Sequence, residues 1–196
     1  MSSLLFVFAA YLLGSVSFGV VMSKAFGLPD PHSYGSGNPG ATNVLRSGKK
    51  LAAALTLFGD AAKGWLPVWL ALHMGLALNW VDAIAAAVFV GHIYPCFYGF
   101  KGGKGVATAF GILLAFSPLV ALCAFATWIA VFAIWRISSL AAIVAGSSSV
   151  LYAGLILGWD RQVLMYLAIG LALIWRHKAN IQRLLKGEES GFRKTR

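Results

Sequence analysis

Seven apolar runs separated by short polar segments constrain the fold of this chain more than any other feature. A helix needs about 20 mostly apolar residues to cross the hydrocarbon core of a bilayer. Only 11% of the residues are charged, against about 25% in an average soluble domain. We therefore expect an all-α, polytopic membrane bundle of about seven transmembrane helices. The expected spans cover about residues 4–25, 51–76, 83–98, 106–116, 119–135, 140–157 and 162–175, with a short turn at 79–82.

The positions of the cations predict an orientation for this bundle. Lys and Arg gather on the cytoplasmic side of membrane proteins. An outside N-terminus and an inside C-terminus put 14 of the 16 cations in inner segments, leaving Arg161 outside and Lys63 within a span. A five-span arrangement has the same parity. The inner cations are Lys24, Arg46, Lys49, Lys50, Lys101, Lys104, Arg136, Arg176, Lys178, Arg183, Lys186, Arg193, Lys194 and Arg196.

The net charge of +10 has the same explanation. Most cations flank apolar runs, so membrane orientation and anionic ligands account for them, and we expect no nucleic-acid partner. We expect one domain over residues 1–196, with a short basic cytoplasmic tail from about residue 176 to 196.

The first inner segment, residues 34–46, has the composition of an anion-binding loop. Glycines allow backbone conformations that turn several N–H groups toward one point. Hydroxyl and amide side chains add neutral donors, and an arginine adds a planar fork suited to phosphate oxygens. An ordinary loop beside lipid headgroups explains the same residues equally well. The candidate phosphate-binding residues are Ser36, Gly37, Asn38, Thr42, Asn43 and Arg46.

The second inner segment reads Lys101-Gly102-Gly103-Lys104-Gly105. It does not match the nucleotide-binding loop, because Tyr98 and Gly105 stand where that motif needs a glycine and a hydroxyl. Two lysines at the start of a helix favour an anion, since a helix N-terminus presents free N–H groups. Either lysine alone could simply set topology. We include Lys101, Gly102, Gly103 and Lys104 as candidates. His92 and Tyr94-Pro95 lie just before this loop, and we expect them to position it, with direct contact to substrate as the alternative.

The third inner segment, residues 176–181, ends the last apolar run. His177 and Asn180 are three residues apart and share one helix face, which as a lone pair would favour capping and packing. Arg183 and Lys186 are expected to face solvent or headgroups. Residues 31–50 and 99–105 contain no Asp or Glu, so we expect no metal and no cofactor.

Two charges lie inside an expected span. Asp60 and Lys63 share a helix face, where they could neutralise each other. Charges within a membrane span are also functional suspects by default, so both interpretations stay open.

Taken together, three motifs resemble the bacterial acyl-phosphate:glycerol-3-phosphate acyltransferase family over essentially the whole chain. They are GSGNPGATNV at 35–44, GHIYPCFYGFKGGKGVAT at 91–108, and RHKANIQRLLKGEE at 176–189. The resemblance implies transfer of a fatty acyl group from acyl phosphate to the sn-1 hydroxyl of glycerol 3-phosphate. The products are lysophosphatidic acid and inorganic phosphate, and the reaction is the first acylation step of phospholipid biosynthesis.

The resemblance also implies roles and partners. Ser36, Arg46 and Lys104 would hold phosphate, with His177, Asn180 and Lys104 as the catalytic set and Ser139 as a weaker member. The expected location is the bacterial inner membrane, with the site facing the cytoplasm. Acyl phosphate, glycerol 3-phosphate and membrane lipids are the expected partners, together with the soluble enzyme that supplies acyl phosphate.

An acyl phosphate is already activated, so no enzyme nucleophile is obligatory. His177 could accept the proton of the attacking hydroxyl, or a phosphate oxygen of the substrate could take it. The three segments are expected to converge in one metal-free pocket. The alternative is a transporter of a phosphorylated metabolite, which would also need cations and broken helices.

Overall fold

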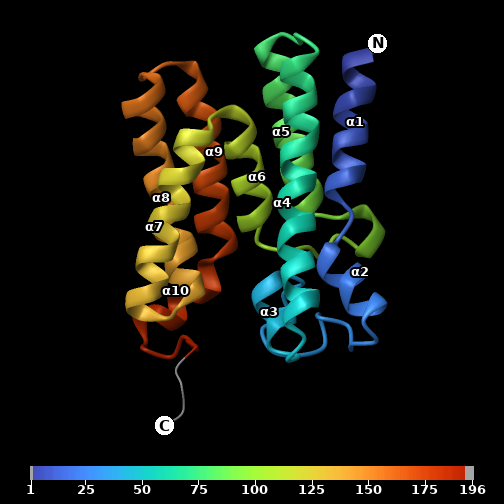
Figure 1. The fold of residues 1–196 in the computed structure, drawn as a ribbon, viewed down its shortest axis with the longest axis vertical. Coiled ribbons are helices and arrows are strands. Elements are labelled where there is room, and N and C mark those ends of the chain that lie inside the picture. The colour runs from blue at the N-terminus through green and yellow to red at the C-terminus, as the bar shows by residue number, and fades with distance from the viewer. Residues whose placement is uncertain (1, 193–196) are drawn as a thin grey trace. The chain divides into compact units, whose positions relative to one another are not determined.

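The computed structural model describes residues 2–192, and within this range the regular structure is entirely helical (Figure 1). Two compact units follow one another along the chain, unit 1 at Met1–Phe116 and unit 2 at Ser117–Arg196. Unit 1 contains α1 (Ser2–Gly14), α2 (Phe18–Ala25), α3 (Ala41–Leu45), α4 (Lys50–His73), α5 (Leu78–Ile93), η1 (Cys96–Tyr98) and α6 (Val106–Phe116). Unit 2 contains α7 (Pro118–Trp135), α8 (Ser138–Leu157), α9 (Arg161–Arg176) and α10 (Lys178–Leu185).

The first apolar run is two helices instead of one. The axes of α1 and α2 are bent by 46° at a short break. Ser17 caps α2 by accepting a hydrogen bond from the backbone N–H of Val20. Hydropathy predicted a continuous span because the residues stay apolar through the break, whereas a serine cap marks the start of a new helix. The break leaves backbone groups near Val16 without the usual helical partners.

Glycines allow the helices of unit 1 to pack with their backbones in contact. A Cβ on Gly14 in α1 would overlap the carbonyl oxygen of Val88 in α5. A Cβ on Gly64 in α4 would overlap the carbonyl oxygen of Thr108 in α6. Small residues at such crossings let helices approach closely in a membrane. Unit 1 is therefore built on the pairs α1 with α5 and α4 with α6.

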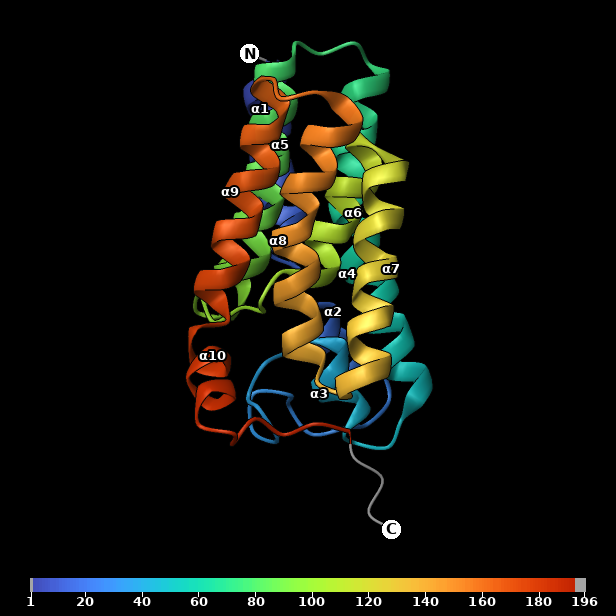
Figure 2. The same ribbon diagram turned by 90° about the vertical axis from the view of Figure 1, so that its left-hand side faces the viewer.

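The turn between α4 and α5 lies earlier in the chain than the sequence suggested. The prediction of a turn at residues 79–82 is wrong, because α5 begins at Leu78 and includes them. The chain reverses at Gly75, whose φ of +68° suits glycine. Polar Asn79 and Asp82 resembled a turn, but they occupy the first turns of a helix. This turn and the start of α1 lie at one end of unit 1, and α3 lies at the other (Figures 1 and 2).

Unit 2 is a layer of long helices followed by a short one. In Figure 2, α8 lies between α7 and α9, and α10 continues the chain beyond α9. Ser117 caps α7, and Pro118 lies in its first turn, where an α-helix tolerates proline best. The hydroxyl groups of Thr127 in α7 and Tyr152 in α8 form a hydrogen bond of 2.7 Å.

The described part of the basic tail folds back onto unit 2. The backbone N–H of Phe192 donates to the carbonyl of Arg136 at 2.9 Å, and its ring packs edge-on against Phe132 at 5.9 Å between centroids. Residues 186–192 thereby reach the turn between α7 and α8. The predicted tail cations Arg193, Lys194 and Arg196 lie outside the described residues.

Three helical segments of residues 2–192 are long and apolar enough to cross a membrane by themselves: Leu78–Tyr98, Pro118–Trp135 and Ser138–Leu157. The bent pair α1 and α2 adds a fourth if it counts as one span, and Val106–Phe116 is a shorter apolar helix. The all-helical architecture is confirmed for residues 2–192, whereas the count of seven spans and the orientation stay predictions.

Candidate active site

Asn43 orders the first loop of unit 1 from within. Its side chain is buried in the short helix α3. Its Oδ1 accepts the backbone N–H of Ser36 at 3.0 Å, and its Nδ2 donates to the carbonyls of Pro31 and Tyr34 at 2.8 and 3.1 Å. Both amide hydrogens are used inside the loop. The structure thus gives Asn43, expected to be a phosphate donor, the role of holding the loop and Ser36 in place.

Ser36, Gly37 and Arg46 form the accessible part of this loop. All three are exposed. A Cβ on Gly35 would overlap Oδ1 of Asn43 and lie 3.3 Å from Cδ of Arg46, so glycine leaves room here for the Asn43 side chain that orders the loop. Gly35 also has a φ of +59°, in the region that favours glycine. The half-buried members of the predicted set are Asn38 and Thr42.

The lysine–glycine loop, residues 99–105, rests on the end of α5. The backbone N–H of Gly103 donates to the carbonyl of His92 at 3.2 Å. A Cβ on Gly102 would overlap that carbonyl, and a Cβ on Gly103 would overlap Nε2 of the His92 ring. His92 therefore contacts the loop directly, as expected. Lys101 is exposed and Lys104 is half-buried.

His32 ties these two loops together. Its Nε2 lies 3.1 Å from the carbonyl oxygen of Lys101, and its Nδ1 lies 2.7 Å from Oδ1 of Asp30. Both partners are hydrogen-bond acceptors, and each lies within hydrogen-bond distance of a different ring nitrogen. The backbone N–H of His32 also donates to Asp30, and this bond is the largest cause of the lowered pKa of the Asp30 carboxyl.

Sequence reasoning missed His32. The only available signal was the spacing Asp30-Pro31-His32, which suits a side-chain turn in which Asp accepts the N–H two residues later. The structure brings the first two predicted segments together within unit 1. Their convergence with the third segment, which belongs to unit 2, stays a prediction.

Glu189 gathers the polar side chains of unit 2. Its Oε1 accepts hydrogen bonds from Ser139 at 2.6 Å and Asn180 at 2.5 Å, and its Oε2 accepts one from Nε of Arg183 at 2.6 Å. Arg183 also forms an ion pair with Glu189, while its side chain stays 42% exposed, in agreement with the prediction that it faces solvent or headgroups. In the sequence Glu189 stood out only as part of a motif, because its partners lie on two different helices, α8 and α10, which must pack before they meet.

His177 occupies the junction between α9 and α10 and is 2% exposed. Its Nδ1 lies 2.8 Å from the carbonyl oxygen of Leu173. A carbonyl only accepts, so Nδ1 carries the hydrogen, and the neutral ring keeps its basic lone pair on Nε2. This tautomer is the one a proton acceptor at Nε2 requires.

The hydrogen bonds to Glu189 make the stability of unit 2 depend on pH. Partial burial alone would raise the pKa of Glu189, but hydrogen bonds from Ser139, Asn180 and Arg183 outweigh it and hold the pKa below the usual 4.5. The unfolded chain then binds a proton at higher pH than the folded one. We expect this stabilisation to be complete above 4.5 and to be lost as pH falls through the lowered pKa.

Thermal unfolding in detergent from about pH 7 to about pH 3.5 measures this effect. Glu189→Gln should melt at a lower temperature than the wild type at neutral pH, and the gap should narrow as the solution becomes acidic. A gap independent of pH would show that the ionised carboxylate contributes nothing.

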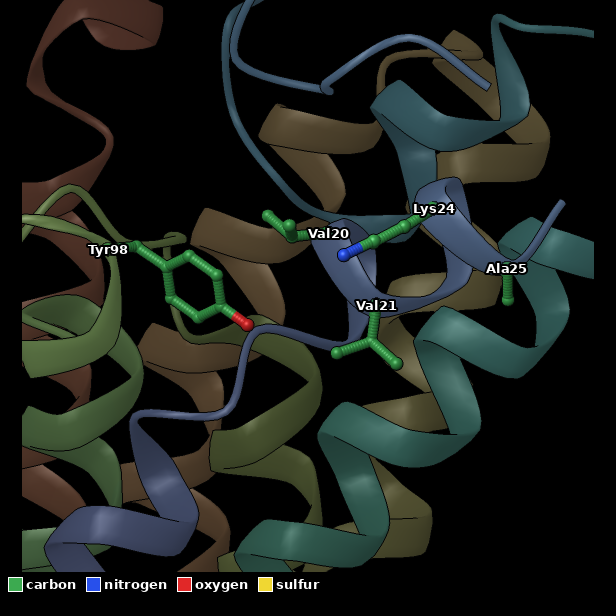
Figure 3. A pocket seen from close by; sticks show the side chains of 5 residues that line it. All are labelled: Val20, Val21, Lys24, Ala25 and Tyr98. Atoms are coloured by element: carbon green, nitrogen blue, oxygen red, sulfur yellow. The ribbon is translucent and has the colours of Figure 1, made fainter. Parts of the chain in front are cut away.

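A shallow hollow lies beside α2 (Figure 3). It is lined by Val20, Val21, Lys24 and Ala25 of α2 and by Tyr98 of η1. Tyr98 and Lys24 extend toward each other across it. These five lining residues are not among the predicted phosphate-binding or catalytic residues. Among residues 2–192, no three His, Cys, Asp or Glu side chains are grouped to hold a metal ion.

Comparison with known proteins decides the family. A family model described as "Glycerol-3-phosphate acyltransferase" matches residues 4–187. The chain belongs to this family. A glycerol-3-phosphate acyltransferase of Methylobacillus flagellatus is 61% identical over 194 residues, covering 99% of each chain. One from Thiobacillus denitrificans is 55% identical and covers 97% of each chain.

Two solved structures of PlsY, an integral membrane glycerol 3-phosphate acyltransferase, share the fold of this family member. The glycerol 3-phosphate form is 43% identical, with a TM-score of 0.93, over 98% of this chain and 96% of that one. The lysophosphatidic acid form is 42% identical, with a TM-score of 0.91 and the same coverage. The resemblance read from the motifs is confirmed: the chain is an acyltransferase enzyme in a membrane, and the transporter alternative is not favoured.

Proposed function

We propose that this glycerol-3-phosphate acyltransferase uses acyl phosphate as its donor and acylates the sn-1 hydroxyl of glycerol 3-phosphate. One observation carries the proposal: two loops of unit 1 are tied together by His32 and carry Ser36, Arg46, Lys101 and Lys104. Cationic side chains and backbone N–H groups are the usual partners of phosphate. Segments 31–50 and 99–105 contain no carboxylate to oppose an anion.

In the proposed reaction the hydroxyl oxygen attacks the carbonyl carbon of the acyl phosphate. A carbon–oxygen ester bond forms, the bond from the carbonyl carbon to the phosphate oxygen breaks, and inorganic phosphate leaves with lysophosphatidic acid as the other product. The leaving phosphate gains negative charge as that bond breaks, and Lys104 and Arg46 are proposed to stabilise it. Holding the two substrates together contributes up to about 7 to 11 kcal/mol.

The proton of the hydroxyl needs an acceptor. We propose Nε2 of His177, because the hydrogen bond from Nδ1 to Leu173 leaves Nε2 unprotonated in the neutral ring. A phosphate oxygen of the substrate is the alternative acceptor. Asn180 and Ser139 are proposed to support this part of the site through Glu189, to which both are hydrogen-bonded.

We further propose that residues 1–196 form one acyltransferase domain to which both units belong. The match of the family to residues 4–187 covers helices of both units and supports this. The proposed membrane is the bacterial inner membrane, crossed about seven times with the N-terminus outside and the substrate loops inside. The distribution of cations supports this orientation. A soluble enzyme that makes acyl phosphate is the proposed source of the donor.

A donor comparison tests the proposal. Purified protein in detergent is mixed with labelled glycerol 3-phosphate and with palmitoyl phosphate, palmitoyl-coenzyme A or palmitoyl acyl carrier protein in parallel. We expect labelled lysophosphatidic acid from palmitoyl phosphate and little from the two thioesters. Product from a thioester alone would overturn the donor assignment, and no product from any donor would overturn the activity.

A further inference from the structure

Three ionisable side chains meet inside unit 1, away from the accessible part of the substrate loops. Asp60 and Lys63 of α4 are 2% and 3% exposed, and His92 of α5 is 7% exposed. Oδ1 of Asp60 lies 2.7 Å from Nζ of Lys63 and 3.6 Å from Nδ1 of His92. Charges buried this deeply are costly unless they are paired, so the group must be neutralised internally.

Neutralisation alone does not account for the contacts of Lys63. Its Nζ also donates to the carbonyl of Val16 at 2.6 Å, in the break between α1 and α2. That carbonyl lies outside both helices and needs a donor in an apolar environment. Lys63 therefore fixes the broken first span to α4 as well as pairing with Asp60. The ring of Phe18, at the start of α2, lies 5.9 Å from the same amine.

His92 joins the buried group to the lysine–glycine loop. Nδ1 of its ring faces Asp60. Nε2, on the other side of the ring, packs so closely against Gly103 that a Cβ there would overlap it. The carbonyl of His92 also accepts the N–H of Gly103. The loop is thus held by both the backbone and the ring of one residue. Lys104 is the next residue along the chain, so the orientation of this ring bears on where that lysine lies.

The helix that follows the loop is attached to the same stretch of α4. A Cβ on Gly111 of α6 would overlap the carbonyl of Ala61, and a Cβ on Gly64 of α4 would overlap the carbonyl of Thr108. Ala61 and Gly64 are next to Asp60 and Lys63 in sequence. The loop is therefore fixed at its start by His92 and at its end by α6, and both attachments lead to one turn of α4.

We infer that Asp60 and His92 are positioning residues for substrate phosphate: the Asp60 carboxylate orients the His92 ring, and the ring holds the lysine–glycine loop so that Lys104 faces the anion. Lys63 pairs with Asp60 and fixes the α1–α2 break beside it. None of the three needs to touch substrate. The inference rests on the proposed function, because it assumes that the loop binds phosphate.

Steady-state kinetics of a double variant separates positioning from neutralisation. Asp60→Asn with Lys63→Met removes both charges together and leaves neither buried alone. If the pair serves only neutrality, the double variant should bind substrates as the wild type does. We expect instead a KM for glycerol 3-phosphate or acyl phosphate raised about tenfold or more, with a smaller change in kcat, since misplacing a binding group by about 1 Å is costly.

His92→Ala supplies a second test that removes no charged pair. It should raise the same KM, and His92→Asn, which keeps a nitrogen near the position of Nδ1, should recover part of the loss. Thr56→Val is the matched control, because Thr56 is a buried polar residue of α4 that bonds only to the carbonyl of Ala52 in its own helix. It should leave KM unchanged.

Melting temperatures in detergent accompany each measurement. A double variant or a His92→Ala variant with wild-type KM would overturn the positioning role. This outcome differs from failure of the proposed function, in which the wild type itself makes no lysophosphatidic acid from acyl phosphate.

Discussion

Replacing Lys104 by alanine is expected to lower kcat/KM by about 100- to 1,000-fold, the range found when one preorganised donor to a developing anion is removed. Lys104 is half-buried directly after Gly103, which is fixed on His92. A fixed and partly desolvated cation interacts more strongly with phosphate than one in open water. Lys101 of the same loop is exposed, so Lys101→Ala should lose much less. Comparing the two alanine variants therefore tests how the burial of a lysine, at equal charge, affects kcat/KM.

The measurement is initial velocity with palmitoyl phosphate and labelled glycerol 3-phosphate, together with melting temperature. Lys104→Arg keeps the charge and should recover only part of the activity, because a planar guanidinium does not replace a compact ammonium group in a tight loop. Equal losses in Lys101→Ala and Lys104→Ala would mean that the loop acts through its overall charge. A near wild-type rate in Lys104→Ala would remove this lysine from the site.

Removing the basic nitrogen of His177 is expected to have the second large effect. His177→Asn retains an amide nitrogen near Nδ1 that can still donate to the carbonyl of Leu173, but it has no counterpart of Nε2. General-base catalysis typically contributes about 100- to 10,000-fold, so we expect kcat to fall by about this factor while the protein stays folded. His177→Gln, which places its amide near Nε2, is the matched variant and lacks the bond to Leu173.

Two results would distinguish the proposed proton acceptors. A large loss of kcat in His177→Asn with an unchanged melting temperature supports the histidine. Retained kcat in the same variant would assign the proton to a phosphate oxygen of the substrate and leave His177 a structural role at the α9–α10 junction.

The membrane class and the family were predictable from the sequence because both depend on local properties. A long apolar run predicts a membrane-spanning helix from its own residues, without knowledge of the helices that pack beside it. The motifs at 35–44, 91–108 and 176–189 carry the family resemblance, and the family match is confirmed. Helix α6 begins and ends where hydropathy predicted, since Gly105 and Ser117 bound it in sequence.

Details that depend on backbone breaks or on distant partners were not predictable in this way. The break between α1 and α2 leaves hydropathy unchanged, and the α4–α5 turn depends on one glycine instead of the polar residues after it. His32 and Glu189 carry little signal alone, because each acts through residues up to 69 and 50 positions away in the chain.

By itself, the sequence determined a helical membrane acyltransferase with cations and glycines in the segments that the proposal assigns to phosphate. Composition and local order fix these properties, because each residue contributes to them wherever it finally lies. Only the tertiary structure decided which polar groups meet around those segments: Asn43 inside its loop, Glu189 between Ser139 and Asn180, and Asp60 and Lys63 beside His92. Hydrogen bonds and ion pairs act over a few ångströms, so their partners exist only after distant segments have packed.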